Sequence, residues 1–220
     1  PDSGRVRLHL AVDAPTRSID TALAGSRGRG GNGPPALCRV PPVGHTAGMA
    51  FTLHTPEEGA DLIRDTYRLG VPLGPGQPVG LLHALGKRER FDDLVVFGAL
   101  LVDLYELFTR PGVHLLSGFY GPAERFLLDS GADIQFVPSD FRRFTPILER
   151  IAPRVVATAV SAPDEDGWMS LSVHAGASIA ELNRAIAAPE RVVIAEVVAD
   201  APRPFGLMPE PPHRLHYDDA

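Results

Sequence analysis

The sequence predicts an α/β fold in which a mainly parallel sheet is flanked by helices, and three observations lead to this prediction. The chain has 220 residues, 44% of them hydrophobic, which is enough to build one sizeable core or two small ones. From Met49 onward, short apolar runs alternate with helical patterns, and prolines and glycines stand where those helices begin and end. Because strands buried on both faces read as continuous apolar runs, this alternation indicates a parallel sheet between two helical layers.

The first globular segment, "TPEEGADLIRDTYRLG", carries the signals of a helix start. Thr55 takes the N-cap position, Pro56 the first helical position and Glu58 the third, which is the pattern of a capping box. The pattern predicts a helix that ends at Gly70. The glycine- and proline-rich turn "GVPLGPGQP" follows, and the next apolar stretch predicts a second helix over about 78–87.

The middle and the end of the chain continue the alternation. Apolar runs at 92–101 and 112–120 predict two strands. Pro122 at the first helical position and Gly131 at the end predict a helix between them. The same signals predict a strand at 134–139, a helix at 139–153 capped by Ser139 or Asp140, a β-branched strand at 154–162, a helix at 177–189 and a strand at 191–199.

Residues 1–48 differ in composition from the rest. They hold six Arg, three Asp, eight Gly and six Pro, with no aromatic residue and no Met, so they carry +3 and leave −9 for 49–220. Because large apolar side chains are needed to offset chain entropy, we expect this basic leader to be disordered. It is interpreted as non-native sequence from cloning or gene-start assignment, or alternatively as a basic interaction tail. The globular domain is predicted over 49–220.

Charge, cysteine count and run length exclude several classes of protein. The net charge of −6 argues against nucleic-acid binding, which requires a basic surface. Cys38 is the single cysteine, so no intramolecular disulfide can form and nothing indicates an oxidising compartment. The longest apolar runs are about half as long as a helix that spans a bilayer. We therefore expect a cytoplasmic protein that binds neither nucleic acid nor membrane.

Functional loops of parallel sheets lie at the carboxyl ends of the strands. Three loops follow predicted strands, "SGFYGPAER", "SAPDEDGWMSLS" and "ADAPRPFG", while the turn "GPGQP" offers backbone N–H groups at a helix start. In the acidic loop, Asp164 is expected to accept hydrogen bonds from backbone amides downstream, and Glu165 and Asp166 to be solvated. No His cluster or spaced set of carboxylates accompanies them, so no metal site is predicted.

Glu196 interrupts the apolar strand "RVVIAEVVA", where an unpaired buried carboxylate is costly. Two interpretations remain open for it. Glu196 faces a polar cleft at the carboxyl edge of the sheet as a site residue, or it lies at the rim or in a structural ion pair, for which Arg203 is the candidate partner. The loop around Phe119 is likewise a site wall or an aromatic plug over the sheet edge.

Four segments, taken in order, resemble the acetyl-CoA hydrolase and CoA-transferase family, of the 4-hydroxybutyrate or acetate CoA-transferase type. They are "GPGQPVGLLHAL", "GFYGPAERFLLDSGADIQFVPSDFRRFTPILE", "PRVVATAVSAPDEDGWMSLS" and "ERVVIAEVVADAPRPFG". The resemblance covers about residues 55–219 and corresponds to the family's amino-terminal half. It implies the NagB/RpiA-like fold of CoA-transferases. Sugar-phosphate isomerases share this fold, but the sequence has no phosphate loop or acid/base pair specific to them.

The resemblance implies that the chain forms one wall of an acyl-CoA cleft, with a coenzyme A thioester as substrate and no tightly bound cofactor. In the family, a glutamate attacks the thioester to give an acyl-glutamyl anhydride and then a glutamyl-CoA thioester, which a carboxylate or water resolves. That glutamate belongs to a carboxyl-terminal half that this sequence lacks, so no catalytic residue is predicted here and the chain alone is expected to be inactive. The implied partners are acyl-CoA, a small carboxylate, the catalytic half or subunit, and further copies of the chain in a homo-oligomer.

The resemblance also implies a set of substrate-binding residues and marks departures from the family pattern. The implied binding residues are Gly76, Gln77, Phe119, Gly121, Ser161, Pro163, Asp164, Gly167, Glu196, Arg203 and Gly206. The departures are Asp166 for His, Trp168 for another aromatic residue, Ser172 for the Gly after Leu, Val198 for Asn and Ala201 for Met. Such departures fit altered specificity or lost activity. A non-catalytic acyl-CoA-binding or regulatory domain is therefore the alternative function.

Overall fold

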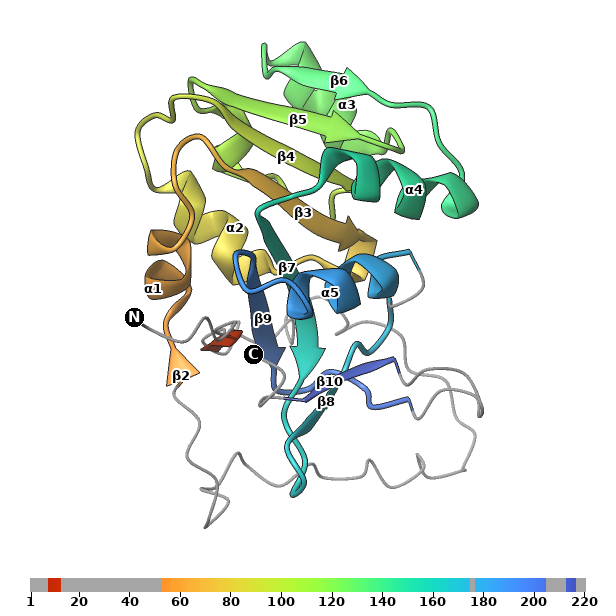
Figure 1. Cartoon of the computed structure of the whole chain (residues 1–220). Helices are drawn as coiled ribbons and strands as arrows, with labels where there is room; N and C mark the ends of the chain where they lie inside the picture. Colours follow the sequence, from red (N-terminus) through yellow and green to blue (C-terminus); the bar gives the residue numbers. More distant parts are fainter. Residues whose placement is uncertain (1–7, 13–52, 175–176, 205–212, 217–220) are drawn as a thin grey trace, which may run out of the picture.

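A computed structural model describes residues 8–12, 53–174, 177–204 and 213–216 of the chain and confirms the α/β class (Figure 1). Its main sheet has eight strands in the order β2-β1-β9-β7-β3-β4-β5-β6, and every neighbouring pair is parallel. These strands are β1 (Leu8–Val12), β2 (Leu53–His54), β3 (Arg68–Leu73), β4 (Leu94–Ala99), β5 (Val113–Ser117), β6 (Ile134–Phe136), β7 (Val155–Ser161) and β9 (Val192–Val198).

Helices cover both faces of this sheet, and a small second sheet lies at one end of it. The second sheet pairs β8 (Trp168–Ser170) antiparallel with β10 (Arg214–His216). The helices are α1 (Pro56–Asp61), α2 (Val79–Gly86), α3 (Pro122–Asp129), α4 (Phe141–Ile151), α5 (Ile179–Ile186) and the 3₁₀ helices η1 (Gly74–Gly76) and η2 (Glu106–Thr109). Figure 1 shows α4 and α5 on the near face of the sheet.

The core has two sides because successive side chains of a strand point to opposite faces. Val155 and Ala157 of β7 belong to the same hydrophobic cluster as the buried leucines of α2. Val156 and Val160, which alternate with them, pack with residues of α5 in a second cluster. The sheet is therefore buried on both faces, as the continuous apolar runs predict.

The direction in which the chain winds reverses between β3 and β7. From β3 the chain proceeds outward through β4 and β5 to the edge strand β6, and then returns by α4 to β7 on the other side of β3. β3 and β7 are thus hydrogen-bonded neighbours that lead into opposite halves of the sheet. In open parallel sheets, such a reversal leaves a crevice at the carboxyl ends of the two strands.

The prediction of a helix that ends at Gly70 is wrong at its end. The capping box at Thr55 is present, but α1 ends at Asp61 and β3 begins at Arg68. Gly70 lies inside β3, where a Cβ atom would lie 3.0 Å from both Leu148 Cδ1 and Pro153 Cγ. The glycine therefore permits close packing of strand against helix rather than ending a helix.

The expectation that residues 1–48 are disordered is contradicted at residues 8–12. These five residues form β1, which pairs with β9 over its whole length and with β2 on the other side. The short apolar stretch "LHLAV" is concealed in a composition averaged over 48 residues, and a neighbouring strand can order it through backbone hydrogen bonds. Residues 1–7 and 13–48 lie outside the described residues, so the domain boundary at Met49 stays a prediction.

Candidate functional site

The candidate site lies at the carboxyl ends of β3 and β7, where the winding of the sheet reverses. The turn η1 directly follows β3, and the acidic loop directly follows β7. A Cβ atom on Gly76 would lie 2.8 Å from Pro72 Cβ and 3.3 Å from both the Cβ and the carbonyl oxygen of His174. The predicted turn at Gly76 therefore meets the segment just after the acidic loop, and a glycine is needed where they touch.

Gln77, the residue after η1, holds the ends of β3 and β4 together. Its buried side chain donates from Nε2 to the carbonyl oxygen of Ala99 at 2.9 Å, and its Oε1 accepts from Val102 N and from the Tyr105 hydroxyl, each at 3.2 Å. Burial raises the pKa of the Tyr105 hydroxyl far above its usual value, so this group stays a donor. The geometry of Gln77 favours a role in shaping the crevice.

Glu196 supports the amino terminus of α2. Its side chain is 1% exposed, and its two carboxylate oxygens accept from Gly80 N at 2.9 Å and Leu81 N at 2.7 Å. A carboxylate at this position satisfies helix N–H groups and interacts favourably with the helix dipole. Arg203, the candidate partner under the ion-pair interpretation, instead forms an ion pair with Asp164 at 3.0 Å.

The acidic loop is a tight turn stabilised from within. Asp164 Oδ1 accepts from Trp168 N at 2.7 Å and from Asp166 N at 3.1 Å, which confirms the predicted cap. Gly167 adopts φ +84°, a conformation that favours glycine. Glu165 and Asp166 are exposed, as expected. The negative charge of this loop therefore stabilises a turn and faces solvent.

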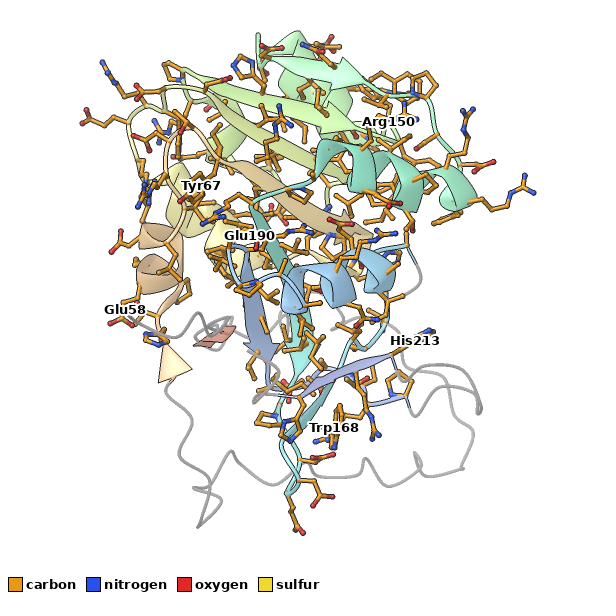
Figure 2. All side chains as sticks on the ribbon, viewed as in Figure 1. Glu58, Tyr67, Arg150, Trp168, Glu190 and His213 are labelled. Atoms are coloured by element: carbon orange, nitrogen blue, oxygen red, sulfur yellow. The ribbon has the colours of Figure 1, made fainter. Side chains whose placement is uncertain are left out.

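The tryptophan of this loop packs against cationic and aromatic side chains of β10. The Arg214 guanidinium lies 4.0 Å from the centre of the Trp168 ring, and the His216 ring meets it edge-on at 4.8 Å. Figure 2 shows Trp168 and His213 at the same end of the molecule. A cavity of about 90 Å³ lies there, lined by Asp164, Trp168, Ser170, Arg203, Pro204, His213 and Arg214. It is smaller than the pockets that usually enclose a ligand.

Ser161 joins the end of β7 to β8. Its hydroxyl accepts from Ser170 N at 2.9 Å, and the Ser170 hydroxyl in turn accepts from Ser172 N at 3.0 Å. Ser172, where the family has glycine, adopts φ +56°. The structure thus gives a physical reason for the usual glycine, because this conformation is strained for other residues.

Phe119 and Gly121 lie in the loop between β5 and α3. The Phe119 ring packs on Phe141 with 5.3 Å between ring centres, and its side chain is partly buried against the core, which favours the aromatic-plug interpretation. Gly121 precedes α3, and its N–H donates to Glu124 Oε2 at 2.9 Å. In the order of the sheet, β3 and β4 separate this loop, which follows β5, from the acidic loop, which follows β7.

Two further residues of the predicted binding set remain. Pro163 lies in the acidic loop, and Gly206 lies outside the described residues.

Glu124 is a structural residue that the sequence analysis missed. It is fully buried, and Oε1 accepts from Leu101 N at 2.9 Å while Oε2 accepts from Gly121 N. It therefore connects the loop after β4 to the start of α3. The sequence does contain a signal for this role. Glu124 is the third helical residue after the cap Gly121, and a glutamate at that position can accept a hydrogen bond from the N–H of the cap residue.

A second cavity lies away from these loops. It has a volume of about 450 Å³ and is lined by Arg68, Asp93, Val95, His114, Leu116, Gln135, Arg150 and Ile151. Three of these residues, Arg68, His114 and Gln135, are each the first or second residue of a strand. This cavity therefore lies at the edge of the sheet where the strands begin. In Figure 2, Arg150 and Trp168 lie at opposite ends of the molecule. Parallel sheets place their functional loops at the other edge.

The described part of the chain offers neither a cluster of metal ligands nor a membrane-spanning helix. No group of three or more His, Cys, Asp or Glu side chains there is arranged to hold a metal ion. None of its helices combines the length and apolar character required to cross a bilayer.

Comparison with known proteins gives likenesses at the level of solved structures. No family model and no curated protein matches this sequence. The crystal structure of RipA from Yersinia pestis superposes with a TM-score of 0.62 at 27% identity, covering 76% of this chain and 40% of RipA. Its E249D mutant gives a TM-score of 0.60 at 28% identity over the same shares.

A CoA-transferase has the same fold. The 4-hydroxybutyrate CoA-transferase from Porphyromonas gingivalis superposes with a TM-score of 0.50 at 20% identity, over 74% of this chain and 36% of that one. The chain therefore spans about two fifths of the length of the structures it matches. These likenesses show that the chain shares its fold with part of a CoA-transferase, and they support the resemblance to that family which the four ordered motifs indicate.

Proposed function

We propose that this chain forms one wall of a cleft that binds an acyl-CoA thioester and a small carboxylate, as the amino-terminal part of a CoA-transferase or acyl-CoA hydrolase. The catalytic glutamate comes from a carboxyl-terminal half that is not within this sequence. The observation that carries the proposal is the meeting of the Gly76 turn and the loop after β8 at the point where the winding reverses. The Gly76 turn belongs to a motif that resembles the family, and the loop after β8 begins within another such motif, which ends at Ser172.

The side chains of this wall hold backbone segments in place and do not take part in the reaction themselves. Gln77 and Glu196 fix the two ends of the segment that leads from β3 into α2. Asp164 fixes the turn after β7. A rigid wall of this kind holds a thioester carbonyl in place for attack, and such positioning supplies roughly 7–11 kcal/mol of the barrier reduction once the nucleophile is present. The chain alone lacks the attacking carboxylate and is expected to bind without turning over.

Binding of coenzyme A by the full chain tests this proposal. We expect isothermal titration with CoA and with acetyl-CoA to show saturable binding. Gly76→Ala is expected to abolish it, because the new Cβ would lie 2.8 Å from Pro72 Cβ. Gly59→Ala on α1 is the matched control, since its Cβ would make an ordinary 3.4 Å contact with Leu81. Circular dichroism of both variants separates loss of the site from loss of the fold.

Covalent chemistry provides a second test. The chain is incubated with acetyl-CoA and acetate, quenched, and examined by intact mass for a CoA thioester on a glutamate, with and without a supplied carboxyl-terminal half of a family member. We expect no adduct and no thiol release from the chain alone, and an adduct on the supplied half. An adduct on the lone chain contradicts the proposal, and Glu106, Glu165 and Glu196 are then the residues to replace first. CoA binding without any adduct in the mixture favours the non-catalytic binding domain.

A further inference from the structure

Three polar side-chain atoms near the candidate site are buried without a hydrogen-bond partner. They are the hydroxyl oxygens of Ser172 and Ser178 and Nε2 of His174. Among the described residues, no other buried side-chain nitrogen or oxygen lacks a hydrogen-bond partner. Buried polar groups are nearly always paired, because leaving one unpaired is costly. Three of them within seven residues indicate a place that a bound molecule completes.

These residues lie over the carboxyl ends of the strands that flank the reversal. The backbone of His174 packs against Gly76, at the turn after β3. Ala177, next to Ser178, belongs to a buried cluster with Leu73 and Ala99, the last residues of β3 and β4. His174 and Ala177 therefore lie beside the ends of the strands that flank the crevice.

The Ser178 hydroxyl lacks the hydrogen bond that its position in the helix usually provides. It takes the N-cap position of α5 and is 1% exposed, yet its hydroxyl forms no capping hydrogen bond. The usual role of a serine at this position is to accept from an N–H of the first turn. A buried hydroxyl that leaves this role unfilled at the start of a helix can donate to a bound anion instead, where the helix dipole also favours negative charge.

The chemistry of the three groups selects the kind of ligand. Two hydroxyls donate, and burial lowers the pKa of His174, so that the imidazole is neutral near pH 7 and donates or accepts at Nε2. The carboxylates of the candidate site are already used, Glu196 by the N–H groups of α2 and Asp164 by Arg203. These groups therefore leave no free carboxylate to bind a cation. A carboxylate ligand, in contrast, offers about four acceptor positions for the hydroxyl and imidazole donors.

We propose that Ser172, His174 and Ser178 bind the carboxylate group of the small acid that exchanges with the acyl-CoA. This rests on the proposed function, since it assigns one substrate of that reaction to named side chains. The two hydroxyls and the imidazole N–H donate to the two carboxylate oxygens, and no proton is transferred on binding.

Acetate binding followed on the His174 ring tests the proposal. Long-range proton–nitrogen NMR spectra of the ¹⁵N-labelled chain are recorded during a titration with sodium acetate at constant pH, and His174→Gln identifies the ring signals. We expect a saturable shift of the His174 nitrogens that sodium chloride at equal ionic strength does not produce. Ser178→Ala and Ser172→Gly are each expected to weaken the affinity about tenfold, as loss of a hydrogen bond to a charged group does. Ser172→Gly also relaxes φ +56°, so that misfolding does not explain its effect.

Ser130→Ala is the matched control, because its exposed hydroxyl donates to the carbonyl oxygen of Phe126 on α3, away from the site. It is expected to leave the acetate affinity unchanged. The proposal is overturned if acetate produces no saturable shift, if chloride produces the same shift, or if Ser178→Ala and Ser172→Gly bind acetate as well as the unmodified chain. CoA binding measured on the same sample separates the two hypotheses. CoA binding without acetate binding removes only this assignment, and acetate binding without CoA binding contradicts the proposed function.

Discussion

The carboxylate of Glu196 on β9 accepts a 2.7 Å hydrogen bond from the backbone N–H of Leu81 on α2, across 115 residues of sequence. The other carboxylate oxygen accepts from the neighbouring N–H of Gly80. One side chain from the middle of the sheet therefore fixes the start of the helix that follows the Gly76 turn. The charge that interrupts an apolar strand is explained by this pairing with a helix terminus.

Replacing Glu196 is expected to destabilise the fold. Glu196→Ala leaves two N–H groups of α2 without these acceptors and is expected to lower the free energy of unfolding by about 3 kcal/mol, measured by urea denaturation. Glu196→Gln keeps one acceptor oxygen and is expected to cost about half as much. Glu190→Ala, an exposed glutamate before β9, is the control and is expected to change stability by less than about 0.5 kcal/mol. Equal stability of Glu196→Ala and Glu190→Ala contradicts the structural role.

Glu124 gives a parallel prediction on the other half of the sheet. Glu124→Ala removes the acceptor for Leu101 N and Gly121 N, both buried contacts, and is expected to cost about 2–4 kcal/mol. Arg125, the next residue along α3, is exposed and its side chain makes no comparable contact with the described residues, so Arg125→Ala is expected to be nearly neutral. Thermal unfolding of the two variants checks this. A neutral Glu124→Ala means that these two loops are held together by other contacts.

Sequence periodicity predicted most of the main sheet because its strands are buried on both faces. The runs that became β4, β5, β7 and β9 are mainly apolar, and Pro122 at the first position of α3 and Asp140 at the cap of α4 are local signals. β8 and β10 escaped prediction because each is three residues long and depends on pairing with the other. Short strands of this kind carry too little pattern to be read alone.

The candidate site was predicted less completely than the fold, for a physical reason. Local patterns placed Asp164 correctly as a cap, since its partners lie two and four residues away. The partners of Glu196 lie 115 and 116 residues away, and those of Gln77 more than 20 residues away. No local pattern determines such contacts. They follow from the order of the strands, which brings distant loops to the same edge of the sheet.

Ser172→Gly is expected to stabilise the protein. Glycine adopts φ +56° without the penalty that serine has, and the variant also removes a buried hydroxyl without a partner. We expect an increase in unfolding free energy on the order of 1 kcal/mol, measured by urea denaturation. Ala152→Gly, at φ +48° after α4, is the control, because it relaxes a similar backbone without removing a polar group. A larger gain for Ser172→Gly than for Ala152→Gly isolates the cost of the hydroxyl, and a loss of stability contradicts the backbone argument.

His174 is expected to make the stability of the fold depend on pH in the mildly acidic range. Burial lowers the pKa of its imidazole below 6.5, because the charged form is poorly solvated in the fold, whereas in the unfolded chain the ring titrates near its ordinary value. Between these two pKa values the unfolded state binds a proton that the folded state does not, so stability falls as the pH is lowered through this range. Above about pH 7 both states are neutral and the group has no effect, and below the folded pKa the loss of stability reaches a plateau.

The variant His174→Gln removes this titration. The free energy of unfolding is measured in urea from pH 8 to pH 5 for the unmodified chain and for the variant. We expect the value for the unmodified chain minus that for the variant to decrease on acidification. Other titrating groups cancel in this difference. A difference that stays constant or increases toward pH 5 contradicts the burial of a neutral His174.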